Sequence, residues 1–238
     1  MKLTILGKYG PFAPKESSTS SYFLETENAK ILIDCGSGAV SKLVDKNAVK
    51  DLSFIILSHL HFDHVSDMGV LSYALSFSGR KDKINVYLPF EDGAVLNLIK
   101  SISIFNLIPI EEGKIYTESG AKFSFYETVH PVKCYGVKVE ADNKVLAYTG
   151  DSVLTENLIN LVKGANFVIA DGNVIESDYK ETLPHMSVKQ ACSLNDYFDG
   201  DLIISHISYK YDDTTISNEI KLYSNTAQVA IENKTYDI

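Results

Sequence analysis

The sequence lacks the features that mark secreted and membrane-spanning proteins. Its three cysteines, Cys35, Cys134 and Cys192, are an odd number and lie far apart, which argues against a disulfide framework and for a reducing compartment. No apolar run approaches the roughly 20 residues that span a bilayer. The start, MKLTILGKYG, has an apolar run that ends at Gly7 and is too short for a signal-peptide core. We therefore expect a cytoplasmic protein with no membrane attachment.

Clusters of basic residues are also absent, and the net charge is −9. Proteins that grip long nucleic acids neutralise many phosphates with a basic patch or arm, so no extended nucleic-acid grip is expected here. No Pro/Gly/Ser-rich linker divides the chain, and 238 residues with 45% apolar composition can bury a sizeable core. These features favour one domain over residues 1–238.

Strand and helix patterns alternate along the chain. Apolar runs bounded by turn residues predict strands at 2–6, 20–26, 30–34, 53–57, 84–88, 121–128, 134–140, 144–149, 167–170, 202–205 and 227–232. Helices are predicted over 63–77 with Asp63 as N-cap, after Pro89, after the N-caps Thr155 and Ser187, and over 215–223. This alternation predicts an α/β (α+β) fold, a four-layer αββα sandwich of two mixed sheets flanked by helices.

Four side chains suited to metal binding follow the apolar strand at 54–57, namely His59, His61, Asp63 and His64. The two histidines at extended spacing point to the same side of the chain, and the turn into the next helix swings Asp63 and His64 toward a second point nearby. Two adjacent metals are therefore more natural than one. Imidazole and carboxylate donors suit Zn²⁺, with Mn²⁺ or iron as the alternatives.

Three further candidates, His130, Asp151 and His206, follow other strand-like runs. Ligands of α/β sheets gather at the carboxyl ends of strands, so these residues are expected to join the first four in one cleft. Taken singly, His130 also reads as a turn residue, Asp151 as a helix cap and His206 as a core histidine. Cys134 reads better as a small buried residue than as a metal thiolate.

With these residues assembled, the sequence resembles the metallo-β-lactamase superfamily, whose motif H-x-H-x-D-H appears at residues 59–64. Within it the chain is similar to the ribonuclease Z-like branch. Residues 206–211 look like that branch's H-x-S-x-R-Y segment, with Lys210 in place of the Arg, and residues 185–191 look like its H-S-T-x-x-Q-A loop. Asp171 stands where the branch has a Glu. The branch's tRNA-binding arm has no room here, because His130 and Asp151 are only 21 positions apart.

The resemblance implies a dinuclear zinc hydrolase, most simply a phosphodiesterase that uses a metal-bridging hydroxide on a small phosphodiester or an RNA end. One metal would be held by His59, His61 and His130, the other by Asp63, His64 and His206, with Asp151 bridging. His185 would donate a proton to the leaving oxygen and Asp171 would orient it, while Ser187 and Ser208 are expected to contact substrate. A lactone, thioester or other carbonyl substrate is the alternative on the same metals, and a homodimer is compatible with the sequence.

Overall fold

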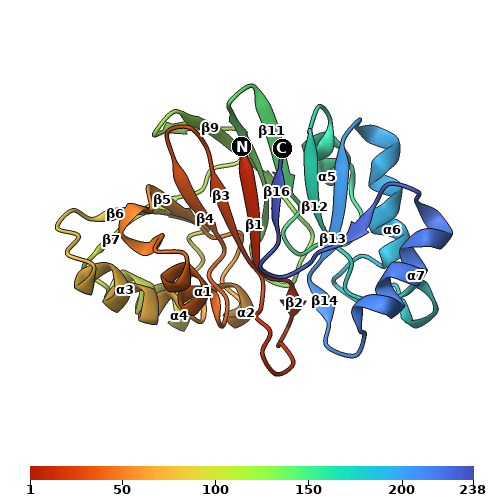
Figure 1. The fold of residues 1–238 in the computed structure, drawn as a ribbon, viewed down its shortest axis with the longest axis horizontal. Helices are drawn as coiled ribbons and strands as arrows, with labels where there is room; N and C mark the ends of the chain where they lie inside the picture. The colour runs from red at the N-terminus through yellow and green to blue at the C-terminus, as the bar shows by residue number, and fades with distance from the viewer.

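The computed structural model describes all 238 residues, and two seven-stranded sheets packed face to face form its centre (Figure 1). In the first sheet the N-terminal and C-terminal strands lie side by side. Strands β16, β1, β3 and β4 run antiparallel, whereas β4 to β7 run parallel. The order across this sheet is β16 (Thr235–Asp237), β1 (Lys2–Gly7), β3 (Ser21–Glu25), β4 (Lys30–Ile33), β5 (Phe54–Ile56), β6 (Ile84–Leu88) and β7 (Phe105–Pro109).

The second sheet is also mixed. Strands β8 to β11 run antiparallel, and β11, β12, β13 and β15 run parallel. Their order is β15 (Gln228–Val229), β13 (Asp201–Ser205), β12 (Phe167–Asp171), β11 (Lys144–Tyr148), β10 (Tyr135–Ala141), β9 (Ala121–Glu127) and β8 (Ile115–Glu118). A separate parallel pair, β2 (Tyr9–Gly10) with β14 (Ile207–Ser208), joins the two halves of the chain.

Helices cover the outer faces of both sheets, which confirms the predicted four-layer sandwich (Figure 1). Helices α1 (Ala39–Asp45), α3 (Met68–Phe77) and α4 (Ala94–Lys100) pack on the first sheet, and α5 (Glu156–Val162), α6 (Val188–Ser193) and α7 (Asp213–Tyr223) on the second. The one-turn helix α2 (Phe62–Val65) follows β5, and short 3₁₀ turns lie at 49–51, 176–178 and 194–197. The longest helix, α7, has 11 residues, and no helix is long and apolar enough to cross a bilayer.

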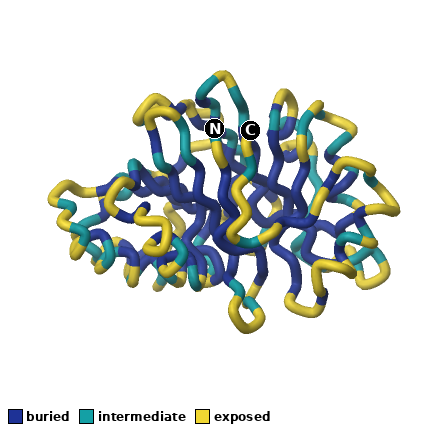
Figure 2. The backbone as a smooth tube through the Cα atoms, in the orientation of Figure 1, coloured by how far each residue is buried: buried dark blue, intermediate teal, exposed yellow.

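The central strands are buried on both faces, as the continuous apolar runs predict. In β5, Phe54 and Ile56 face the other sheet, whereas Ile55 packs with Leu57 beneath the helices. Each such side chain contributes roughly 1.5–3 kcal/mol through burial. Figure 2 shows the buried backbone running through the middle of the sandwich, with the connecting loops exposed at its edges. The candidate site lies where strands of both sheets end at one of these edges, and most of its residues are buried.

The single helix predicted over 63–77 is instead divided between α2 and α3. At the break, the Asp67 amide donates to the Cys35 carbonyl at 3.0 Å, which removes it from the helical hydrogen-bond pattern. The Asp67 carboxylate accepts bonds from the Gly38 and Val40 amides, both at 3.0 Å. Asp67, which lies outside α1, thereby provides an acceptor for two backbone amides at the start of that helix. Because these hydrogen bonds join segments far apart in the sequence, the sequence pattern alone does not predict the break.

Other local expectations also change. The prediction that Asp63 caps a helix is wrong, because His61 holds the N-cap position and Asp63 lies inside α2. The helix expected from Pro89 begins five residues later at Ala94. Strands β7, β8 and β16 have no counterpart in the prediction. They lie at or next to sheet edges with several exposed positions, so their strand character comes from pairing with a neighbour rather than from apolar patterning.

Candidate metal centre

The predicted histidines and aspartates converge at one edge of the sandwich, where α2, β2 and β14 lie (Figure 1). Each comes from the end of a strand. The segment 59–64 follows β5, His130 follows β9, Asp151 follows β11, and His206 follows β13. Because both sheets present these strand ends at the same edge, residues far apart in sequence come within reach of one another.

Asp151 is shared by three groups of ligand-type side chains, two of four residues and a smaller one with Asp171 and His185. The first group of four combines His59, His61 and His130 with Asp151. His61 Nδ1 lies 3.1 Å from His59 Nε2 and 3.0 Å from His130 Nε2. Asp151 Oδ2 lies 3.6 Å from His59 Nε2 and 3.8 Å from His130 Nε2. Ligand atoms at about 2.0–2.2 Å from a tetrahedral zinc ion are roughly 3.3–3.6 Å apart. The spacing of these four side chains therefore suits a metal ion between them.

The second group combines Asp63, His64 and His206 with the same Asp151. Asp151 Oδ2 lies 3.2 Å from His206 Nε2 and 3.4 Å from His64 Nε2. Asp63 Oδ2 lies 3.6 Å from His64 Nε2 and 3.9 Å from His206 Nε2. Asp151 is thus the side chain that the two groups share.

Unpaired polar atoms in this cluster indicate that a cation belongs there. Only three buried side-chain polar atoms in the protein have no hydrogen-bond partner, and two of them are His64 Nε2 and Asp151 Oδ1. A buried polar atom without a partner costs about 1–3 kcal/mol. A divalent cation coordinated between the side chains satisfies imidazole nitrogen and carboxylate oxygen together, so the residues present fit a metal.

Burial and charge set the protonation of the cluster. Burial lowers the pKa of His59 and His206 well below the usual value and that of His130 to about 4, so these rings keep a free lone pair at pH 7. Burial would also lower the pKa of His64, but the carboxylates of Asp151 and Asp34 raise it well above its usual value. A positive charge is favoured at this point of the cluster.

Asp34 supports the cluster through a hydrogen bond to His64, a role that no motif in the sequence indicates. Its Oδ2 accepts hydrogen bonds from His64 Nδ1 at 2.7 Å, Ser58 Oγ at 2.8 Å and Tyr148 Oη at 2.9 Å, while Oδ1 accepts from the Ser58 amide at 2.7 Å. A carboxylate on Nδ1 fixes the tautomer that leaves Nε2 free for a metal. The sequence gives only a weak indication of this role for Asp34. Asp34 directly follows β4 and has a positive φ of 56°, which aspartate tolerates better than most residues.

The rings of His206 and His130 are also held in place by neighbouring polar groups. Ser20 Oγ lies 2.9 Å from His206 Nδ1, and the Pro184 carbonyl lies 3.2 Å from His130 Nδ1. Gly10 allows the backbone to pass close to His206, since a Cβ at Gly10 would lie 2.1 Å from the ring Nε2. The Nε2 atoms of both rings are therefore left facing the cluster.

His185 and Asp171 form the predicted pair beside the cluster. His185 Nδ1 lies 2.8 Å from Asp171 Oδ2, and the His185 ring lies 5.0 Å from the ring of His206 and 5.3 Å from that of His130. Burial lowers the pKa of His185, but the charge and hydrogen bond of Asp171 outweigh it and raise the value to about 9. Burial raises the pKa of Asp171 to about 6. At neutral pH the pair is a protonated imidazole on an ionised carboxylate.

The two serines expected to contact substrate differ in their surroundings. Ser187 is fully buried, its Oγ donates to Glu176 Oε2 at 2.6 Å, and it accepts from the Gln190 amide as the cap of α6. The predicted capping box is present, so this hydroxyl serves the helix. Ser208 lies in β14 opposite Gly10 and is buried.

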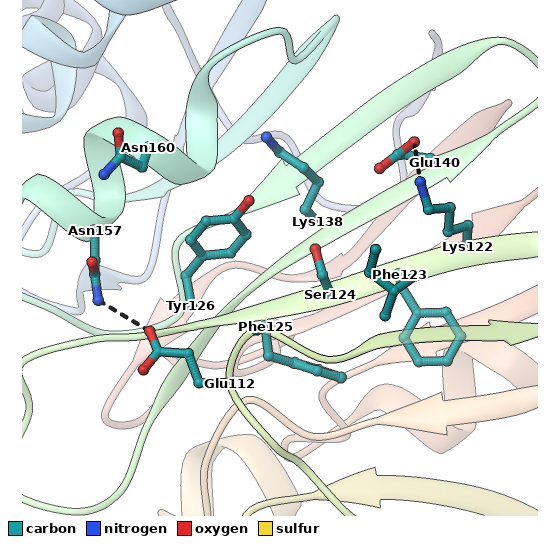
Figure 3. Close-up of a pocket in the computed structure, with 12 residues that line it drawn as sticks. Glu112, Lys122, Phe123, Ser124, Phe125, Tyr126, Lys138, Glu140, Asn157 and Asn160 are labelled. Carbon is teal, nitrogen blue, oxygen red and sulfur yellow. Dashed lines mark hydrogen bonds and ion pairs between the residues drawn. The ribbon is translucent and has the colours of Figure 1, made fainter.

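A pocket elsewhere on the protein has a different character (Figure 3). It lies on the outer side of β9 and β10, beside α5, and contains none of the cluster residues. Several of its polar groups already have partners. Asn157 Nδ2 donates to Glu112 at 3.2 Å, and Lys138 Nζ donates to the Lys163 carbonyl at 2.9 Å. This pocket therefore offers no convergent set of groups for catalysis.

The segment between His130 and Asp151 is occupied by the hairpin of β10 and β11, which turns at Asp142 and Asn143. Both strands pair within the second sheet. The structure thus leaves no inserted arm at this point, in agreement with the short spacing in the sequence.

Comparison with known proteins identifies the family. The family model described as anti-Pycsar protein Apyc1 matches residues 1–229. The probable metallo-hydrolase YhfI of Bacillus subtilis is 27% identical over 214 residues, with 88% of each chain covered. A ribonuclease Z of Methanosarcina acetivorans is 23% identical over 272 residues, which cover 90% of this chain and 89% of the relative.

Solved structures show the same architecture. The metallo-β-lactamase fold protein YhfI superposes with a TM-score of 0.91 at 24% identity, covering 99% of both chains. The short form of human tRNase Z superposes with a TM-score of 0.81 at 16% identity, covering 100% of this chain and 99% of that one. These matches confirm the resemblance to the metallo-β-lactamase superfamily. The chain has the metallo-β-lactamase fold, is a metal-dependent hydrolase, and belongs to the anti-Pycsar protein Apyc1 family.

Proposed function

We propose that the protein is a dinuclear zinc phosphodiesterase of the ribonuclease Z-like type that acts on small phosphodiesters or RNA ends. The observation that carries the proposal is that Asp151 is shared by two groups of four ligand-type side chains, one with His59, His61 and His130 and one with Asp63, His64 and His206. One group alone would serve a single metal, whereas a carboxylate shared between two groups suits a pair of ions held side by side.

Some side chains would bind the metal ions, and others orient the metal-binding rings. One ion would be held by His59, His61 and His130, the other by Asp63, His64 and His206, and both by Asp151. When bound, such a pair of divalent ions supplies an activated water and a Lewis acid for a phosphoryl oxygen. Asp34 and Ser20 keep the rings of His64 and His206 in the orientation that presents Nε2 to the cluster.

We assign the proton for the leaving oxygen to His185. Its Nδ1 is engaged with Asp171, so the proton that can be transferred is the one on Nε2. Asp171 keeps the ring oriented and stabilises its positive charge until the transfer. The Asp171 carboxylate is itself held by the amides of Ser152 and Asn173, at 3.2 and 3.1 Å.

Two features favour small substrates over a folded RNA. The chain has a hairpin where the ribonuclease Z-like branch carries its arm, and its net charge is −9. Relatives named ribonuclease Z support a reaction on a phosphodiester. The metal centre would bind the phosphate locally, so that an extended basic surface is not needed.

A substrate panel on the zinc-loaded protein tests the proposal. It comprises bis-p-nitrophenyl phosphate, cyclic mononucleotides, cyclic dinucleotides, precursor tRNA, a lactone and a thioester. We expect turnover of one or more small phosphodiesters at a kcat/KM well above that of both carbonyl substrates. Turnover confined to the lactone or thioester would instead assign the metal centre to carbonyl chemistry. The Asp63→Ala variant serves as the control that separates the site's activity from a contaminant.

A further inference from the structure

The backbone carbonyl of Asp151 accepts hydrogen bonds from two buried side chains of another segment. Thr128 Oγ1 lies 3.0 Å and Cys134 Sγ 3.4 Å from this oxygen. The two donors stand at the two ends of the loop that carries His130, and the Thr128 amide closes that loop by donating to the Cys134 carbonyl at 3.0 Å. Thr128 is 7% exposed and Cys134 is fully buried. A hydroxyl and a thiol from one loop therefore hold the backbone of the residue that the metal-binding groups share.

Further contacts keep the two segments together. The Val129 amide donates to Ser152 Oγ at 3.2 Å, one residue beyond Asp151. Gly150, on its other side, has a φ of 61°, and a Cβ there would lie 3.2 Å from Cys134 Sγ, closer than ordinary van der Waals contact. Glycine adopts this left-handed conformation without strain and leaves room for the sulfur. The segment with Asp151 thus lies directly against the loop of His130.

The carboxylate of Asp151 depends on this backbone for its position. Its Oδ2 lies between 3.2 and 3.8 Å from the Nε2 atoms of four histidines, and its Oδ1 has no hydrogen-bond partner. A shift of the backbone would carry the carboxylate toward some of the rings and away from others. Metal–ligand distances tolerate a change of only about 0.2 Å, so the contacts at the carbonyl affect how well the carboxylate can reach a metal ion.

We propose that Thr128 and Cys134 are positioning residues that hold Asp151 where its carboxylate serves both metal ions, an inference that rests on the proposed dinuclear site. Cys134 then acts as a hydrogen-bond donor and lies outside every group of metal-ligand atoms. Because Asp151 belongs to both groups of four, loss of a donor to its carbonyl should weaken both zinc equivalents together. Asp34 differs in this respect, since it bonds to the ring of His64, which belongs to one of these groups.

Competition with a chromophoric zinc chelator on the full chain measures the two affinities. Thr128→Val keeps the shape of the side chain and removes the donor. We expect the Kd of both zinc equivalents to rise roughly 10- to 100-fold, the range for loss of an outer-shell partner. Thr128→Ser keeps the hydroxyl and should bind zinc as the wild type does. Cys134→Ala should raise both Kd values by less than Thr128→Val, because a thiol is a weaker donor than a hydroxyl.

Thr4→Val is the matched control, because it removes a buried threonine hydroxyl outside the cluster. Thr4 is 1% exposed, and its Oγ1 lies 2.8 Å from Thr235 Oγ1 where β1 pairs with β16. This variant should be less stable to denaturant in the metal-free state, with both zinc Kd values unchanged. If Thr4→Val weakened zinc binding as much as Thr128→Val, the effect would be one of stability alone and the positioning role would be overturned. Unchanged zinc binding in Thr128→Val, or weakening of only one of two equivalents, would also overturn it.

The measurement is independent of the reaction that the site catalyses. Zinc affinity is determined without substrate, so a lack of phosphodiesterase turnover would refute the proposed function and leave this test intact. A wild-type protein that bound a single zinc ion would refute the dinuclear site. The positioning role of Thr128 would then stand if Thr128→Val weakened that ion, and it would fall if the affinity stayed the same. A wild-type protein that bound no zinc would overturn both proposals.

Discussion

The substitution Asp34→Asn tests how the buried network beneath the cluster supports metal binding. Asp34 accepts four hydrogen bonds, three of them at Oδ2, and one of those comes from His64 Nδ1. An asparagine keeps the shape but removes the charge and puts an NH₂ group where one oxygen accepts. Whichever way the amide turns, at least one buried donor faces another donor.

The size of the effect follows from these contacts. Loss of an outer-shell partner of a metal-binding histidine typically weakens metal affinity 10- to 100-fold, which corresponds to about 1.4–2.7 kcal/mol. His64 belongs to only one of the two groups. We therefore expect one zinc equivalent to weaken by roughly that factor and the other to stay near its wild-type affinity. Global stability should also fall by about 1–3 kcal/mol, because one buried donor is left unpaired.

Competition with a chromophoric zinc chelator resolves the two equivalents, and denaturant unfolding of the metal-free protein reports stability. The matched control is Asp67→Asn, because Asp67 accepts hydrogen bonds from the Gly38 and Val40 amides and from none of the cluster rings. It should cost stability without changing zinc affinity. If Asp34→Asn lost stability but bound both equivalents like the wild type, the positioning role of Asp34 would be refuted.

Four further outcomes are expected. Asp63→Ala should abolish turnover while the circular dichroism spectrum stays unchanged, since ligand loss leaves both sheets packed; wild-type rate and metal content in this variant would contradict the ligand assignment. His185→Ala should lower kcat on an alkyl phosphodiester roughly 10²–10⁴-fold and much less on a p-nitrophenyl ester, whose leaving group needs little protonation; equal losses would point to positioning alone. Precursor tRNA should be cleaved poorly at physiological salt beside small phosphodiesters, and efficient cleavage with a steep salt dependence would show an unforeseen nucleic-acid grip. Chelation should lower Tm, because metal binding stabilises only the folded chain, and an unchanged Tm would count against a bound metal.

The sequence predicts most of the candidate site because its residues stand in recognisable places. His206 comes directly after an apolar strand, and His59 and His61 follow another within five residues. Both strands are identified by their composition. Since strand ends of an α/β sandwich meet at one edge, order along the chain suffices to predict their convergence. The capping box at Ser187 is likewise local, and the structure contains it.

What the sequence does not reveal depends on contacts between distant segments. Asp34 looks like any polar residue at a strand end until Tyr148 and His64, from two other parts of the chain, are placed against it. The break at Asp67 similarly depends on the start of α1. The stacking of Phe12 on Tyr209 joins loops 197 residues apart in sequence and leaves no periodic pattern to detect.

The most direct test of the central claim is a zinc titration of the metal-free protein, followed by the rate of bis-p-nitrophenyl phosphate hydrolysis. Two groups that share Asp151 predict that activity rises until two equivalents are bound and then levels off. A plateau at one equivalent, or no hydrolysis at any zinc concentration, would contradict a dinuclear phosphodiesterase.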